Sequence, residues 1–215
     1  MSRSGSTGAR TGVGPARSFD PRRVGSLECD TWVCYYRREW WRFLRAAVLV
    51  VRHAFALPWP TTLRGAWLVL RANQKWAPVP DNDPDAARRL MRRFYALVAR
   101  HHGETFDVAE AARLEVEWWR VHREHQHDGT VPQVDGTDPP ADPALTEAVA
   151  RLYAHVYGVE ADDVRLAAAE RAAAMDLSDV WVAAGCDPDS PLVPRERAAL
   201  VRSYAALLAA VHRPA

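Results

Sequence analysis

Start and stop signals for helices divide this chain into short segments. Aspartate followed by proline caps and opens a helix at Asp83–Pro84 and again at Asp142–Pro143. Gly103 and Gly158 each follow a run with helical periodicity, as glycine does where a helix ends. No run alternates apolar and polar residues as a half-buried strand would. The sequence therefore predicts an all-α fold.

The helices expected from these signals are 28–57, 61–75, 83–102, 107–127, 142–157, 162–184 and 194–212. Because the connections are mostly short, about seven helices of this kind predict a single-domain bundle. We expect the helical domain to span residues 28 to 213. The Gly-, Ser- and Arg-rich residues 1–26 have no apolar period and predict a disordered basic tail, and residues 129–142 predict a loop.

Charge and hydropathy argue against nucleic-acid-binding and membrane-spanning classes of protein. The 28 basic and 27 acidic residues nearly cancel, so neither a nucleic acid nor a membrane is expected as a partner. The longest apolar run, Ala46–Val51, is far shorter than the roughly 20 residues that span a bilayer, and no signal peptide is evident. Cys29, Cys34 and Cys186 are expected to be reduced thiols of a soluble, cytoplasmic protein. Lys75 is the one lysine among the basic residues, which is typical of a GC-rich bacterial genome.

Glu115 and His122 of the fourth expected helix lie among the tryptophans of its apolar face. An arc of about 160° on this helix holds a mixed set of residues: Ala111, Leu114, Glu115, Trp118, Trp119, Val121, His122 and His125. The other charged residues of the helix lie on the opposite side at spacings that suit salt bridges with water access. Glu39 lies in a similar apolar stripe of the first expected helix. Burying a carboxylate is costly unless it is paired, protonated or bound to a metal, so these residues need partners.

A metal centre is one arrangement that supplies partners. Glu39, Glu115, His122 and His125 would be ligands for iron or manganese, with an aspartate of the sixth expected helix facing them. His122 and His125 are one turn apart and suit a shared metal. The paired Glu-x2-His motif common in bundle di-iron sites is absent from this face.

Two alternatives need no metal. In the first, Glu39, Glu115, His122 and His101 form a buried network that fixes the register of the helices. In the second, Glu115 and His122 orient a small ligand or transfer protons in a tryptophan-lined pocket.

The sequence thus predicts a small-molecule enzyme or binding protein with Glu115 and His122 as catalytic residues. In its sharper form the enzyme is a metal-dependent oxidase or oxygenase. The alternative is a non-catalytic interaction or regulatory protein in which the tryptophans form a partner surface and the Glu/His network is structural. The substrate and the oligomeric state do not follow from the sequence.

Overall fold

The computed structural model describes residues 17–127 and 141–212, and eight α-helices account for most of these residues. The helices are α1 (Pro21–Tyr36), α2 (Trp40–Ala54), α3 (Trp59–Trp76), α4 (Pro84–His102), α5 (Val108–His127), α6 (Pro143–Tyr157), α7 (Arg165–Ala183) and α8 (Leu192–Val211). No strand occurs within the described ranges, which confirms the all-α prediction. None of the helices in these ranges is long and apolar enough to cross a membrane.

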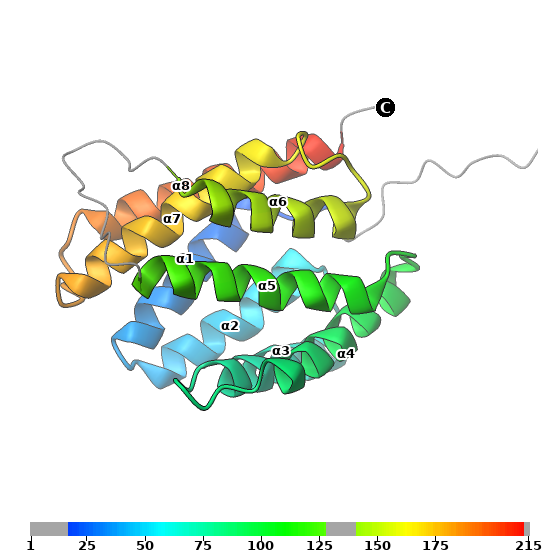
Figure 1. Ribbon diagram of the computed structural model, residues 1–215, viewed down its shortest axis with the longest axis horizontal. Helices are drawn as coiled ribbons and strands as arrows, with labels where there is room; N and C mark the ends of the chain where they lie inside the picture. Colours follow the sequence, from blue (N-terminus) through cyan, green and yellow to red (C-terminus); the bar gives the residue numbers. More distant parts are fainter. Residues whose placement is uncertain (1–16, 128–140, 213–215) are drawn as a thin grey trace, which may run out of the picture.

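The helices form a closed ring of neighbours. Each packs against the next, and α8 returns to pack against α1. Figure 1 shows α5 across the front, between α6 above and α3 and α4 below, with α1 and α2 behind it. One core cluster among α1, α6, α7 and α8 includes Leu145 and Met175, and another among α2 to α5 includes Phe94 and Leu114. Trp118 of α5 packs against both clusters, so α5 joins the two halves.

The capping residues act as the sequence predicts. The Asp83 carboxylate accepts a hydrogen bond from the Ala86 amide at 2.8 Å, and Asp142 accepts one from the Leu145 amide at 2.6 Å. Gly103 adopts a left-handed conformation with φ of 69° at the end of α4. Such a conformation is cheap only for glycine. The expected loop at 129–142 lies outside the described residues up to position 140.

The first helix begins earlier than predicted. Pro21 occupies the first turn of α1, and the Asp20 carboxylate accepts hydrogen bonds from the amides of Arg22 and Arg23. This is the same Asp-Pro device that opens α4 and α6. The first helix therefore starts at Pro21 rather than Glu28, and residues 1–16 of the expected tail lie outside the described residues.

The predicted helix from Glu28 to Leu57 is in fact two helices, which brings the number in the described residues to eight. Arg38 adopts a left-handed conformation with φ of 60°, and the Glu39 amide donates to the Cys34 carbonyl at 2.8 Å to close the end of α1. The sequence has neither proline nor glycine at this point, so it lacks the usual signal for a break.

Candidate functional site

Glu115 lies on α5 where α4 packs against it. The Tyr95 hydroxyl donates a 2.6 Å hydrogen bond to the Glu115 carboxylate. Burial raises the pKa of Glu115, while the Tyr95 hydrogen bond and the positive charge of Arg171 act in the opposite direction. Glu115 thus has a partner inside the bundle, but the partner is a tyrosine rather than one of the expected ligands.

His122 and His125 pair with aspartates of α7. Nε2 of His122 lies 3.0 Å from Oδ2 of Asp179, and Nε2 of His125 lies 3.1 Å from Oδ1 of Asp176. Both imidazoles are about one-fifth exposed, whereas the Asp176 side chain is only 1% exposed. Burial raises the pKa of Asp176 to about 6. Gln126 also donates to Asp179, at 2.7 Å, so the pairs cross-link α5 and α7 at one end of the bundle.

Glu39 lies elsewhere, at the junction of α1 and α2. Its carboxylate accepts hydrogen bonds from Arg37 at 2.8 Å and from Arg42 at 2.9 Å. These two hydrogen bonds hold the pKa of Glu39 below its usual value. The break in the predicted long helix is the physical reason, because it changes the direction in which Glu39 points.

The structure therefore does not assemble Glu39, Glu115, His122 and His125 into one ligand set. Within residues 17–127 and 141–212, no group of three or more His, Cys, Asp or Glu side chains is placed to hold a metal ion. His101, which the network alternative included, is exposed on α4 beside the ring of His102.

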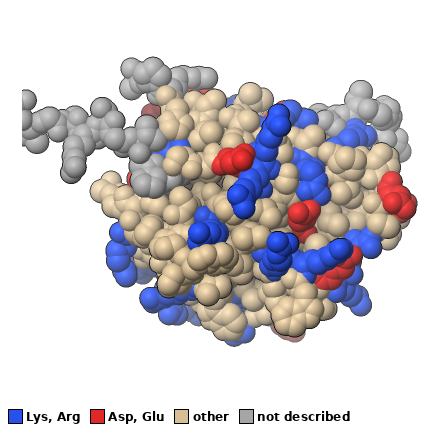
Figure 2. Space-filling model, turned by 180° about the vertical axis from the view of Figure 1, so that it is seen from behind, with Lys and Arg blue, Asp and Glu red and all other residues tan. Residues whose placement is uncertain are grey.

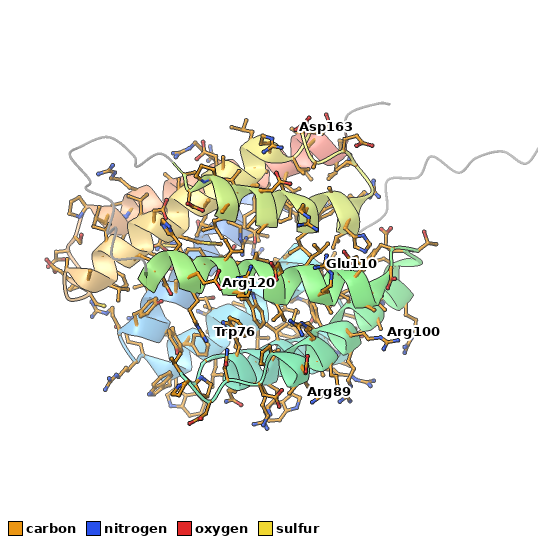
Figure 3. The ribbon with its side chains drawn as sticks, viewed as in Figure 1. Trp76, Arg89, Arg100, Glu110, Arg120 and Asp163 are labelled. Atoms are coloured by element: carbon orange, nitrogen blue, oxygen red, sulfur yellow. The ribbon has the colours of Figure 1, made fainter. Side chains whose placement is uncertain are left out.

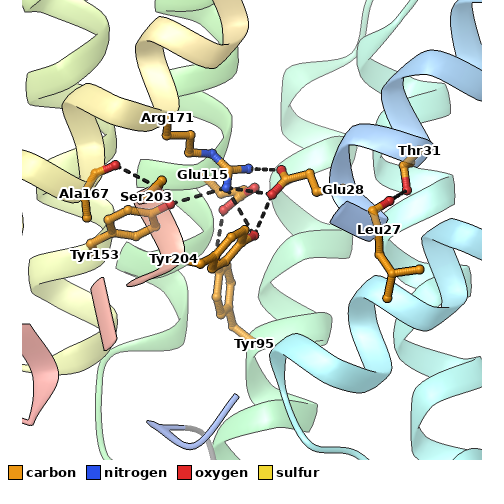
Figure 4. Close-up of polar contacts among 10 residues, drawn as sticks. All are labelled: Leu27, Glu28, Thr31, Tyr95, Glu115, Tyr153, Ala167, Arg171, Ser203 and Tyr204. Carbon is orange, nitrogen blue, oxygen red and sulfur yellow. Dashed lines mark hydrogen bonds and ion pairs between the residues drawn. The ribbon is translucent and has the colours of Figure 1, made fainter. Parts of the chain in front are cut away.

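A buried polar network that sequence reasoning missed lies among α1, α6, α7 and α8 (Figure 4). Arg171 of α7 pairs with Glu28 of α1, and its Nη1 lies 3.1 Å from Oε2 of that carboxylate. Tyr204 of α8 donates a 2.6 Å hydrogen bond to the same carboxylate, and Arg171 donates to the Tyr153 hydroxyl of α6 at 3.3 Å. The network ties four helices together. Sequence could have revealed the network only by showing that Arg171 lies on the inward side of α7. The alanine-rich sequence around Arg171 has no distinct apolar side, so it does not show which side faces inward.

Glu196 of α8 is a second buried acid. Its side chain is fully buried beside the Cys29 thiol, and no nitrogen or oxygen donor within residues 17–127 and 141–212 contacts its carboxylate. Burial raises the pKa of Glu196 to about 8, and the nearby Cys29 and Arg197 act in the opposite direction. The buried environment therefore favours the protonated form of Glu196.

The cavities of the described residues lie away from the predicted catalytic residues. A groove of about 260 Å³ between α4 and α5 is lined by Asp85, Arg88, Arg89, Arg92, Ala109 and Ala112. Figure 3 places Arg89 at the outer edge of α4 and Trp76 between α3 and α5. A second cavity, of about 10 Å³, lies beside Phe55 and Phe106. Neither of these two cavities is lined by Glu115 or His122.

Four of the nine tryptophans instead lie on the outside of α2 and α3. We call the following exposed side chains the aromatic surface: Tyr35, Trp40, Trp41, Leu44, Trp59, Leu63 and Trp67. Trp41 is 87% exposed and Trp67 is 60% exposed. Only two of the 15 residues of α2 are buried, although most of the helix is apolar. The ring of helices leaves this face uncovered.

The two parts of the aromatic surface meet at the turn between α2 and α3. Trp41, Leu44 and Arg52 lie on one side of α2 at helical spacing. The Arg52 guanidinium lies 4.3 Å from the centre of the Trp59 ring, which begins the α3 part. Trp59, Leu63 and Trp67 then follow at intervals of four residues. Arg52 thus connects the α2 part of the aromatic surface to the α3 part.

No protein-family model matches the chain, and no curated protein or solved structure shows significant similarity to it.

Proposed function

We propose that this chain is a binding protein that uses the aromatic surface to hold an anionic partner. The observation that carries the proposal is the exposure of four tryptophans on two adjacent helices that contain no acidic residue. Soluble monomers rarely leave a contiguous apolar patch of this kind unless it binds something. Tryptophan is also the side chain most enriched at the energetic centres of interfaces.

Charge defines the partner. The segment from Trp40 to Pro80 contains six basic residues, namely Arg42, Arg45, Arg52, Arg64, Arg71 and Lys75, and no aspartate or glutamate. Arg42 pairs with Glu39, which lies directly before the segment. The other five cations still make the segment a local concentration of positive charge in a nearly neutral chain. Complementary charge selects a partner and accelerates its association.

Quenching of tryptophan fluorescence by acrylamide tests this proposal. The full chain is mixed with each of three anionic probes: vesicles containing anionic lipid, polyglutamate and a DNA duplex. We expect at least one probe to protect the exposed tryptophans, and we expect Trp41→Ser together with Trp67→Ser to abolish that protection. If no probe protects them, an anionic partner for this surface is ruled out.

A small-molecule enzyme is the second candidate. Its support is that His122 and His125, both singled out from sequence, face the buried carboxylate of Asp176 and its neighbour Asp179. Elemental analysis of the purified chain tests the metal-dependent form. Stoichiometric iron or manganese that is lost in His122→Ala without loss of helicity would support it. A metal-free protein that stays folded would contradict it.

A further inference from the structure

We infer that the partner of the aromatic surface is an anionic lipid membrane, which the surface contacts from one side without crossing it. This inference rests on the proposed binding function and names the partner. It assigns the exposed tryptophans to the headgroup layer and the neighbouring cations to lipid phosphates.

The composition of the surface suits the membrane–water interface. Trp40, Trp41, Trp59 and Trp67 are each at least half exposed, and Leu44 and Leu63 are exposed beside them. Tryptophan prefers the level of the lipid headgroups, where its ring leaves water and its N–H keeps a polar partner. Helices of this kind lie in the plane of the interface with the apolar side inserted.

Two arginines lie against the exposed tryptophan rings. The Arg52 guanidinium lies over the Trp59 ring, and that of Arg71 lies 5.7 Å from the Trp67 ring centre. Arg45, Arg64 and Lys75 are exposed on the same two helices. Arginine buries its aliphatic stem along an apolar surface while its head meets phosphate. Each cation near an anionic leaflet contributes to binding in addition to the apolar contacts.

The net charge of the whole chain hides this pattern. A charge of +1 predicts no attraction to a membrane, but it averages the basic segment with acidic residues elsewhere. At physiological ionic strength charges act over only about 8 Å. The positive charge of α2 and α3, rather than the net charge of the chain, therefore decides which partners this surface attracts. Seen from behind in Figure 2, the molecule has basic side chains spread widely among uncharged ones, with acidic side chains in fewer places.

Two other occupants fit less well. A second copy of the chain would bring two basic surfaces together, and such like-charge contact is costly. An acidic protein would need to match the outer sides of two helices, on which neither described cavity lies. A fluid bilayer needs no such match, because lipid headgroups rearrange around the inserted rings.

Vesicle flotation tests the inference. The full chain is mixed with phosphatidylcholine vesicles, either pure or containing about 30% phosphatidylglycerol. We expect flotation with the anionic vesicles alone. Raising the salt from about 0.05 M to about 0.5 M should release most of the bound chain, because salt screens the attraction.

Paired variants locate the contact. Trp41→Ser with Trp67→Ser and, separately, Arg45→Glu with Arg64→Glu should each lower the vesicle partition coefficient at least about tenfold. The matched controls lie outside the surface. Leu166→Ser removes a side chain that is 65% exposed on α7, and Arg151→Glu reverses an exposed charge on α6. Both should float like the unmodified chain.

Three results would overturn the inference. They are equal flotation with neutral and anionic vesicles, flotation that neither surface variant reduces, and no flotation at all. If vesicles fail but polyglutamate protects the tryptophans from acrylamide, the partner is an acidic protein. The proposed binding function then stands while the membrane inference fails.

Discussion

Helices α2 and α7 are similar in average hydropathy but differ in how much of each helix is buried. Helix α2 is rich in tryptophan, leucine and valine, yet two of its 15 residues are buried. Helix α7 is rich in alanine, and ten of its 19 residues are buried, including Asp176. The difference lies in their neighbours. Helices α6 and α8 both pack on α7, whereas α2 packs mainly against α1 and makes few contacts with α3. The proposed partner would cover the apolar side chains of α2 that α1 and α3 leave exposed.

The burial of α7 is tested most strongly by substituting Arg171. Arg171→Ala leaves Glu28 as an uncompensated buried charge, so we expect a loss of about 3–5 kcal/mol in the free energy of unfolding. Urea denaturation measures the loss. Arg45→Ala, an exposed matched control on α2, should change stability by less than about 0.5 kcal/mol. Similar losses at both positions would mean that the two helices are not differently buried.

Glu196 predicts how stability depends on pH. Its ordinary pKa is 4.5, and in the folded chain burial raises it to about 8. The stabilisation of the protonated form is therefore complete below the ordinary pKa and is lost as the pH rises through the folded value. We expect the free energy of unfolding to fall by about 3 kcal/mol between about pH 5 and pH 8.

Glu196→Gln should remove this part of the pH dependence, because glutamine stays neutral. Glu147→Gln, at an exposed position on α6, should keep it. A Glu196→Gln profile as steep as that of the unmodified chain would mean that Glu196 does not titrate in this range.

The close packing of α1 on α8 predicts a smaller loss of stability when a glycine at the contact is replaced. A Cβ added at Gly25 would lie 2.7 Å from the Val201 amide nitrogen, so backbone would have to move. We expect Gly25→Ala to lower the free energy of unfolding by about 1–3 kcal/mol. Gly65→Ala in α3 meets the Phe94 side chain at 3.3 Å, which leaves the neighbour room to adjust. The calorimetric unfolding temperature should therefore fall less for Gly65→Ala than for Gly25→Ala. Equal falls in unfolding temperature would contradict the difference in packing.

Local signals made most of the fold predictable. Asp-Pro caps and terminal glycines placed α4 and α6 because these residues fix the backbone wherever they occur. The same device at Asp20–Pro21 was not recognised from sequence, and the start of α1 was placed too late. The break at Arg38 was missed because an arginine in a left-handed conformation has no signature in sequence.

The candidate site was less predictable. Helical periodicity identified the inward side of α5, but it does not say which helix faces that side, so Tyr95 was not foreseen as the partner of Glu115. The pairs of His122 and His125 with α7 agree with the expectation that an aspartate there would face them. The exposure of α2 could not be predicted either. An apolar stripe has the same sequence pattern whether another helix of the fold or an outside partner covers it.

The free energy of unfolding of Trp41→Ser with Trp67→Ser tests the central claim most directly, since the claim is that these rings are uncovered by the fold. We predict that urea denaturation gives a value within about 0.5 kcal/mol of the unmodified chain, as for other exposed positions. A loss of about 3 kcal/mol or more, typical of a tryptophan removed from a core, would contradict the account.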